Sequence, residues 1–151
     1  MYSDIKINKK IYKFFRLIFH KFTLAPKDIT VEISTKCSLE CKMCFRSPLG
    51  VKDFLMPFEI FKDVSFGKID YLTFVGLGEI FCHDQLACIL LFAKQMLPYT
   101  RIEISTNLTH FNEPLLQKII KDKIINQISI SVDDINIVSP FYHIFSQEIA
   151  T

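Results

Sequence analysis

From Pro26 onward, the sequence alternates between short β-branched segments and segments with helical patterning. The segments rich in Ile, Val, Thr and aromatic residues, which favour strands, are 29–35, 69–77, 101–106 and 127–132. The segments patterned and long enough for helices are 57–66, 84–97 and 113–122. Because a helix between two strands of one sheet makes a right-handed crossover, neighbouring strands run parallel. The sequence therefore predicts an α/β fold with a parallel sheet, in which Pro57 opens one helix and Asp84 caps the next.

Polar or reactive residues directly follow each predicted strand. They are KCSLECKMC after the first strand, GLGE after the second, STN after the third and SVDD after the fourth. In parallel α/β sheets, ligands bind at the carboxyl ends of the strands, which all lie at one edge of the sheet. The pattern therefore predicts a single ligand-binding rim to which all of these segments contribute.

Three of the five cysteines, Cys37, Cys41 and Cys44, form a C-x3-C-x2-C motif. An odd number of cysteines cannot be paired completely into disulfides, and the close spacing favours a metal or cluster site. Thiolates select zinc, copper(I) or iron-sulfur clusters. A structural zinc site normally has four ligands, for which Cys82 and His83 are candidates. A four-iron cluster held by three thiolates instead leaves one iron open, which is typical of a reactive site.

The segment ISTKCSLECKMCFR resembles the signature of the radical S-adenosylmethionine (radical SAM) enzymes, especially the peptide-modifying branch that carries auxiliary clusters. LTFVGLGEIFCH (72–83) is similar to the family's second-strand segment. IEISTN (102–107) and ISISVDD (128–134) are similar to its third- and fourth-strand segments. The resemblance implies a partial (β/α) barrel of the radical SAM type with about four βα units, preceded here by a basic amphipathic helix.

The resemblance also implies the cofactors and their ligands. The three motif cysteines would bind a 4Fe-4S cluster, whose open iron binds S-adenosyl-L-methionine and cleaves it to methionine and a 5'-deoxyadenosyl radical. Glu79 is the candidate partner of the cofactor's amino group, and Gly76 and Gly78 would let the backbone approach the ligand. The other candidate cofactor-binding residues are Phe45, Ser105, Asn107, Ser131 and Asp133. No catalytic residue is assigned.

Several residues near these motifs also have an ordinary structural interpretation. Cys82 and Cys88 are expected to be small buried hydrophobic residues. Lys42 and Arg46 flank the cysteines, where positive charge would favour thiolates or the cofactor's carboxylate, but both are expected to be solvated surface charges. Phe45 follows the third motif cysteine, but with 15 Phe in the chain, core packing is an equal alternative to a place over the cluster or beside the adenine.

Some positions depart from the family pattern. Leu77 replaces one expected glycine, Leu108 stands where relatives of the TNG type have glycine, and Ile80 where they commonly have proline. The fifth-strand segment that contacts adenine and a cysteine-rich region for auxiliary clusters are not recognised in 135–151. A parallel sheet that ends at the fourth strand exposes an edge. We therefore expect a partner or a dimer to cover this edge, or the chain to be a fragment of a longer protein.

Basic residues are concentrated near the N-terminus. The net charge is +2, but residues 1–27 hold seven Lys or Arg against one Asp. Apolar residues recur there at helical spacing and are Ile7, Ile11, Phe14, Phe15, Ile18 and Phe22. This pattern predicts a basic amphipathic helix over 5–22 that packs on the following domain, or lies on an anionic membrane or a partner protein. Because neither a secretory signal nor an apolar run of about 18 residues is recognised, a cytoplasmic chain is expected.

The predicted organisation is therefore an N-terminal helix region (1–27), a radical SAM core (28–134) and a C-terminal tail (135–151). The first functional hypothesis is an enzyme that takes an electron from a donor such as flavodoxin or ferredoxin and modifies an unknown substrate, for which the resemblance suggests a peptide. Nucleic acid is not an expected partner. The alternatives are a non-catalytic truncated remnant of such an enzyme and a zinc-stabilised interaction module.

Overall fold

The computed structural model describes residues 26–131 of the 151-residue chain. The predicted N-terminal helix, Asp133 and the predicted tail lie outside the described residues. In chain order the elements are β1 (Asp28–Val31), α2 (Phe58–Lys62), β2 (Tyr71–Phe74), the short 3-10 helix η1 (Ile80–Cys82), α3 (Leu86–Met96), β3 (Arg101–Thr106), α4 (Glu113–Lys121) and β4 (Gln127–Ile130). The strands pair in parallel in the order β1-β2-β3-β4, which confirms the α/β fold. Within the described residues, this is an open sheet with β1 and β4 at its edges.

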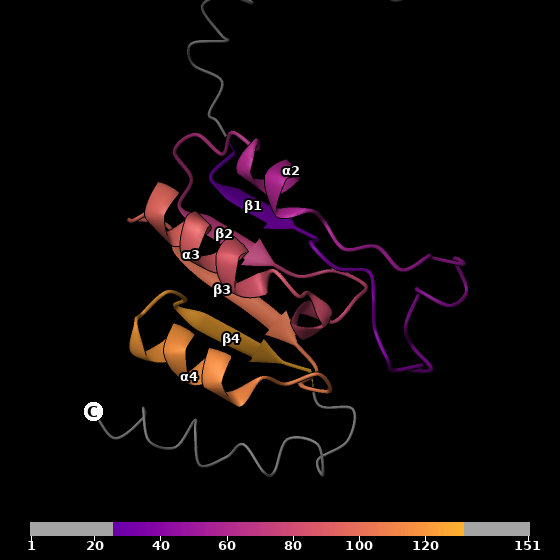
Figure 1. Cartoon of the computed structure of the whole chain (residues 1–151). Helices are drawn as coiled ribbons and strands as arrows, with labels where there is room; N and C mark the ends of the chain where they lie inside the picture. The colour runs from indigo at the N-terminus through magenta and orange to yellow at the C-terminus, as the bar shows by residue number, and fades with distance from the viewer. Residues whose placement is uncertain (1–25, 132–151) are drawn as a thin grey trace, which may run out of the picture.

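The apolar core lies between the sheet and the helices, which Figure 1 shows together on one side of the sheet. Alternate residues of the central strands are buried there, among them Leu72 of β2 and Ile104 of β3. Phe61 of α2 has its ring centroid 5.8 Å from that of Phe74 in β2 and 6.3 Å from that of Phe92 in α3. These aromatic contacts join α2 and α3 to the sheet, and burial of their apolar area stabilises this packing.

The opposite side of the sheet is largely polar. The alternate strand positions on this side include Thr30, Thr73, Glu103, Ser105 and Ser129, which are half-buried or exposed, and the exposed Tyr71. Antiparallel sheets often have strands in which buried apolar and solvent-facing polar residues alternate. The strands of this parallel sheet show the same alternation. Exposure of this polar face to water therefore costs little free energy. The partner or dimer expected at the edge of the sheet stays a prediction.

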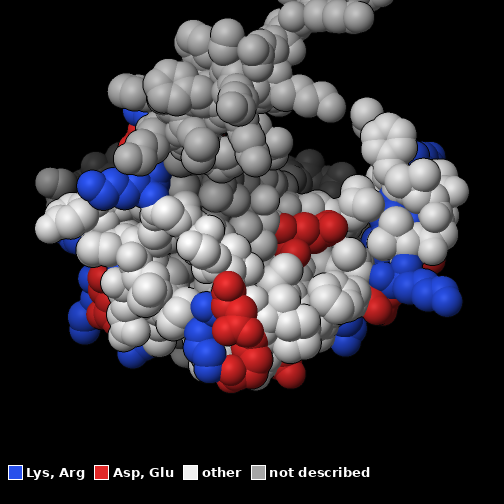
Figure 2. All heavy atoms as spheres, turned by 90° about the horizontal axis from the view of Figure 1, so that it is seen from above, with Lys and Arg blue, Asp and Glu red and all other residues white. Residues whose placement is uncertain are grey.

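Charged side chains of both signs lie on the surface, and Figure 2 shows Lys and Arg beside Asp and Glu on one face. Lys27 pairs with Asp70 at 3.2 Å, and Arg101 pairs with Glu103 at 2.9 Å. Such exposed pairs each contribute only about 0–1 kcal/mol. The apolar core therefore supplies most of the stabilisation. None of the described helices is of the length and apolar character that crossing a bilayer requires.

The strand predicted over 101–106 is observed with the same bounds, whereas other predicted elements extend beyond the observed ones and one predicted cap is wrong. The first strand ends at Val31, and α2 ends at Lys62. The N-cap of α3 is Gln85 rather than Asp84. The backbone N–H of Gln85 donates to Nδ1 of the buried His83 at 3.1 Å, and no side chain caps the start of α3.

Candidate functional site

The carboxyl ends of the strands meet at one pocket of about 150 Å³, which we call the rim pocket. Its lining residues are Cys37, Leu39, Cys41, Cys44, Val75, Gly76, Leu77, Gly78, Glu79, Ser105, Thr106, Asn107 and Ser131. Four segments that are far apart in the sequence thus contribute to one cavity, as the strand-end pattern predicts. Of the predicted site residues, Phe45 is not part of this lining, and Asp133 lies outside the described residues.

The cysteines lie on a long connection between β1 and α2, residues 36–53, which we call the cysteine loop. Its two ends are held side by side. The backbone N–H of Thr35 donates to the carbonyl of Phe54 at 2.9 Å, and Ser34 pairs with Leu55 in an antiparallel bridge. Figure 1 shows the loop extending beyond the carboxyl ends of the strands. The fold therefore presents the cysteines at the ligand-binding edge of the sheet.

The thiols of Cys37 and Cys44 accept hydrogen bonds from N–H groups. The Cys37 sulfur accepts from the backbone of Leu39 at 3.4 Å and from Nδ2 of Asn107 at 3.5 Å. The Cys44 sulfur accepts from the backbone of Arg46 at 3.4 Å. Such N–H donors stabilise negative charge on cysteine sulfur and tune the potentials of iron-sulfur clusters.

The motif thiols line the same pocket without converging on a single point. Among the described residues, no three His, Cys, Asp or Glu side chains are close enough together to hold one metal ion. Cys41 and Cys44 also line a second cavity of about 310 Å³ within the cysteine loop. The number and kind of sulfur donors that line the pocket, three cysteine thiols, match a cluster with three protein ligands. Cluster binding itself stays a prediction.

The two predicted glycines let the loop after β2 lie directly against the end of β1. A Cβ atom at Gly78 would overlap the backbone carbonyl of Ser34, and one at Gly76 would overlap the side chain of Glu32. The carboxylate of Glu32 accepts a hydrogen bond from the backbone N–H of Leu77. Both glycines thus lie against the segment that follows β1, and their predicted approach to a ligand stays a prediction.

Gly78→Ala should therefore destabilise the fold more than Gly76→Ala. The added methyl at position 78 meets backbone, which cannot move aside, and we expect a loss of about 1–3 kcal/mol. At position 76 the obstacle is an exposed, flexible side chain, and the loss should not exceed about 1 kcal/mol. Urea unfolding of both variants measures the difference. Equal losses would contradict the backbone contact at Gly78.

Glu79 is buried at the centre of the site, with 1% of its surface exposed. Its carboxylate accepts hydrogen bonds from the hydroxyl of Thr106, the backbone N–H of Asn107 at 2.6 Å and the backbone N–H of Phe81 at 3.1 Å. Its own backbone N–H donates to the carbonyl of Lys36 at 2.8 Å, directly before the first motif cysteine. Glu79 thus joins the cysteine loop, the loop after β2 and the end of β3, while its predicted contact with an amino group stays a prediction.

The segment after β3 is a tight turn closed by its own side chains. Oδ1 of Asn107 accepts from the backbone and the hydroxyl of Thr109 at 3.0 and 2.7 Å. Leu108 has φ of 62° and a side chain that is only 2% exposed. A left-handed backbone costs a non-glycine residue about 1–2 kcal/mol, which burial of the Leu side chain offsets. The departure from glycine at this position is therefore tolerated in this fold without opening the turn.

Ser105 and Ser131 line the rim pocket, and the backbone N–H of Ser131 donates to the carbonyl of Thr106 at 2.9 Å. Phe45 is 69% exposed, so the alternative of core packing for this residue is wrong. Its predicted place over the cluster or near the adenine stays a prediction. The serines are thus placed where a ligand in the rim pocket could be hydrogen-bonded, as the strand-end pattern predicts.

The candidates for a fourth zinc ligand are His83 and Cys82. Both ring nitrogens of His83 make hydrogen bonds within the protein: Nε2 donates to the carbonyl of Met56 at 2.8 Å, and Nδ1 accepts from Gln85 at 3.1 Å. Burial, followed by the charges of Glu79 and Cys37, raises the pKa of the Cys82 thiol. Cys88 is exposed, so its prediction as a buried hydrophobic residue is wrong.

The raised pKa of Cys82 predicts slow alkylation. Because only the thiolate reacts, Cys82 should reach half of its maximal labelling rate by iodoacetamide above the ordinary thiol pKa of 9.0. Labelling over a pH series, with peptide mapping by mass spectrometry, measures this, and the exposed Cys88 serves as the internal control. Half-maximal labelling of Cys82 at or below that pH would contradict the assignment.

Sequence reasoning missed two residues of the site, Thr106 and Glu32. Thr106 continues the alternation of Ile102 and Ile104 and is buried, yet it is polar and donates to Glu79. A polar residue at a core position of a strand indicates a buried partner, and this signal was present in the sequence. Glu32 carried no comparable signal, because its role depends on the path of the loop after β2.

No protein-family model matches the chain, and no curated protein matches it. Among solved structures, the fold is similar to the crystal structure of BtrN in complex with AdoMet and 2-DOIA, with a TM-score of 0.52 and 21% sequence identity. The match covers 69% of this chain and 44% of the BtrN chain, so this chain spans less than half of that protein. BtrN is a radical SAM enzyme. The described residues therefore share an α/β fold with that structure.

Proposed function

We propose that the chain binds a 4Fe-4S cluster through Cys37, Cys41 and Cys44 and uses it to cleave S-adenosyl-L-methionine reductively. The observation that carries this proposal is that the pocket lined by all three cysteines is also lined by the GLGE segment and by the ends of β3 and β4. The fold that the chain shares with BtrN, which was crystallised with AdoMet, supports it. When bound, the cluster would supply the electron that converts S-adenosyl-L-methionine to methionine and a 5'-deoxyadenosyl radical.

The chain's own residues would hold and shield the cofactors. The N–H donors to Cys37 and Cys44 favour the thiolate forms that bind iron. The hydrogen bonds of Glu79 keep the walls of the rim pocket in fixed positions, and Ser105 and Ser131 offer hydroxyl groups to the carboxylate or ribose of the bound cofactor. Preorganised polar groups in a partly enclosed pocket bind and orient a ligand with little rearrangement.

Substrate and partners are proposed on the sequence resemblance. The cysteine segment resembles that of peptide-modifying enzymes, so we propose a peptide substrate and a flavodoxin or ferredoxin as electron donor. A partner or second copy at the edge of β4 would extend the sheet. Contact of the N-terminal basic segment with a membrane surface stays a prediction.

Product analysis tests the proposed function. Protein reconstituted anaerobically with iron and sulfide, then reduced with dithionite in the presence of S-adenosyl-L-methionine, should form 5'-deoxyadenosine, quantified by liquid chromatography and mass spectrometry. Cys41→Ser should form none, and Cys88→Ser should match the unaltered protein. A brown protein that forms no product would point to a non-catalytic remnant, and a colourless protein with stoichiometric zinc would point to the zinc module.

A further inference from the structure

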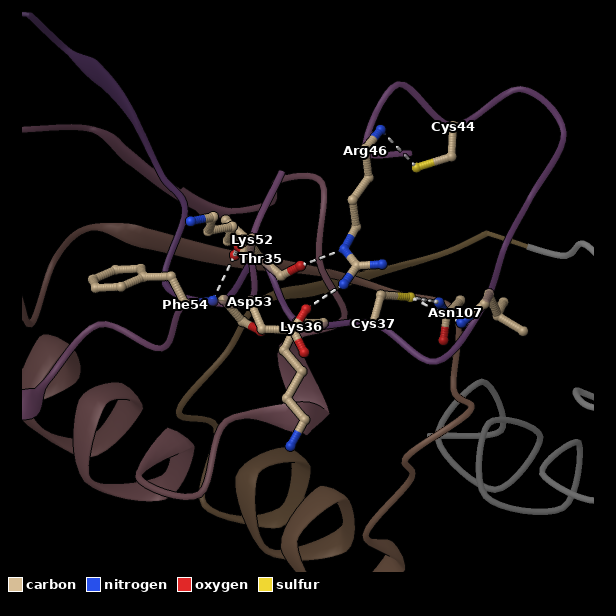
Figure 3. Close-up of polar contacts among 11 residues, drawn as sticks. Thr35, Lys36, Cys37, Cys44, Arg46, Lys52, Asp53, Phe54 and Asn107 are labelled. Carbon is tan, nitrogen blue, oxygen red and sulfur yellow. Dashed lines mark hydrogen bonds and ion pairs between the residues drawn. The ribbon is translucent and has the colours of Figure 1, made fainter. Parts of the chain in front are cut away.

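Arg46 lies on the cysteine loop but reaches back to its base. Its Nε donates to the backbone carbonyl of Thr35 at 2.8 Å, and its guanidinium pairs with Asp53. The side chain of Arg46 is only 19% exposed, so the prediction of a solvated surface charge is wrong for this residue. Figure 3 shows the guanidinium beside Thr35 and Asp53, with Cys44 close to Arg46 on the same loop. One planar group therefore contacts both ends of the loop at once.

The base of the loop is closed by a second set of contacts through Thr35. Its hydroxyl donates to the carbonyl of Lys52 at 2.7 Å and accepts from the backbone N–H of Phe54 at 2.8 Å. The backbone N–H of Val51 donates to the carbonyl of Arg46 at 3.0 Å, so the segment before Asp53 also contacts Arg46. We call Thr35, Arg46 and Asp53 the loop clasp.

The clasp links the two ends of the cysteine motif through side-chain contacts. Thr35 precedes Cys37 by two residues, and Arg46 follows Cys44 by two residues. The Arg46 side chain fixes these two points to each other, and the Arg46 backbone donates to the Cys44 sulfur at 3.4 Å. We propose that Arg46 is a positioning residue, which sets the separation of Cys37 and Cys44 and holds the N–H donor at the Cys44 sulfur. This inference rests on the proposed function in that these cysteines bind the cluster.

Arginine is required because one side chain must bind a carbonyl and a carboxylate in different directions. Lysine at this position can keep the ion pair with Asp53 but lacks the fixed fork that also reaches the carbonyl of Thr35. Arg46→Lys should therefore restore part of what Arg46→Gln loses. Asp53→Asn should have a smaller effect than Arg46→Gln, because the Asp53 side chain is 56% exposed and only the ion pair is lost.

The first test uses the unloaded full chain and is independent of any cluster. Hydrogen–deuterium exchange of Arg46→Gln should be faster across residues 36–53 and unchanged across β3 and β4. Arg101→Gln is the matched control, because Arg101 makes a comparable ion pair with Glu103 at 2.9 Å at the opposite end of the sheet. If the cysteine loop of Arg46→Gln exchanges as slowly as that of the unaltered protein, Arg46 does not hold the ends of the loop together.

The second test asks whether the clasp positions the thiols toward the cluster. After anaerobic reconstitution, Arg46→Gln should bind about 10-fold less iron, as replacement of outer partners of metal ligands does. In the fraction that loads, the midpoint potential should shift to a more negative value, because the N–H donor to the Cys44 sulfur is no longer held in place. A purely structural role would lower the yield of folded protein and leave that potential unchanged.

The outcomes separate the two proposals. If the unaltered protein loads no cluster, the proposed function fails, and the inference that Arg46 positions cluster ligands fails with it. If the unaltered protein loads and Arg46→Gln matches it in iron content and potential, only the inference is overturned. Partial recovery of the iron content and the midpoint potential in Arg46→Lys, with both unchanged in Arg101→Gln, would support the role of Arg46 as a positioning residue.

Discussion

Replacement of Cys37, Cys41 or Cys44 by serine is expected to lower the iron and sulfide content of the reconstituted protein at least about 10-fold. Each thiolate would hold one iron, and a serine hydroxyl does not deprotonate to replace it at neutral pH. The loss should be similar for all three positions, because all three line the rim pocket. Iron and sulfide assays and the visible absorption of the reconstituted protein measure the effect.

Two control variants sharpen this prediction. Cys88→Ser alters an exposed cysteine on α3 and should load as the unaltered protein does. Cys82→Ser tests the remaining cysteine near the site, whose thiol has a raised pKa and should not be needed. A strong loss of metal in Cys82→Ser, with zinc as the bound metal, would favour a four-ligand zinc site over the cluster.

Glu79→Gln is expected to destabilise the fold by about 3 kcal/mol, the loss typical of hydrogen bonds to a buried charged group. The carboxylate accepts from Thr106, Asn107 and Phe81, and an amide offers one acceptor oxygen and places an NH2 group against the remaining donors. The loss would loosen the contact between the loop after β2 and the end of β3. Urea unfolding followed by circular dichroism measures the change.

Glu103→Gln is the matched control for Glu79→Gln. Glu103 lies on the polar side of β3 and makes a single ion pair with Arg101, so its replacement should cost less than about 1 kcal/mol. If Glu79→Gln is as stable as this control, the hydrogen bonds of Glu79 do not hold the site together. Its carboxylate would then be available for a ligand, as the family resemblance implies.

The order and type of the elements could be predicted from the sequence, because the strands carry strong local signals. Ile102 and Ile104 alternate with polar residues on β3, and the parallel pairing follows from a helix between each pair of strands. The boundaries could not be predicted as well. Gly76 and Gly78, in the loop after β2, lie against the segment that follows β1, and this contact is absent from any local window of sequence.

The members of the rim pocket could be predicted because strand direction alone brings their segments together. Their internal contacts could not. The hydrogen bond from Thr106 to Glu79 spans 27 residues, and the one from Asn107 to Cys37 spans 70. Arg46 was interpreted as a surface charge because nothing local indicates that Asp53 and the carbonyl of Thr35 lie within its reach. These contacts form only when the folded sheet brings loops that are distant in the sequence close together.

Electron paramagnetic resonance of the reduced, anaerobically reconstituted protein, recorded with and without S-adenosyl-L-methionine, tests whether the cluster binds the cofactor. We expect a four-iron signal that changes shape when the cofactor is added, because one iron has no protein ligand and is open to it. A cluster signal that is indifferent to the cofactor, or a folded protein that assembles no cluster, would contradict the proposed function.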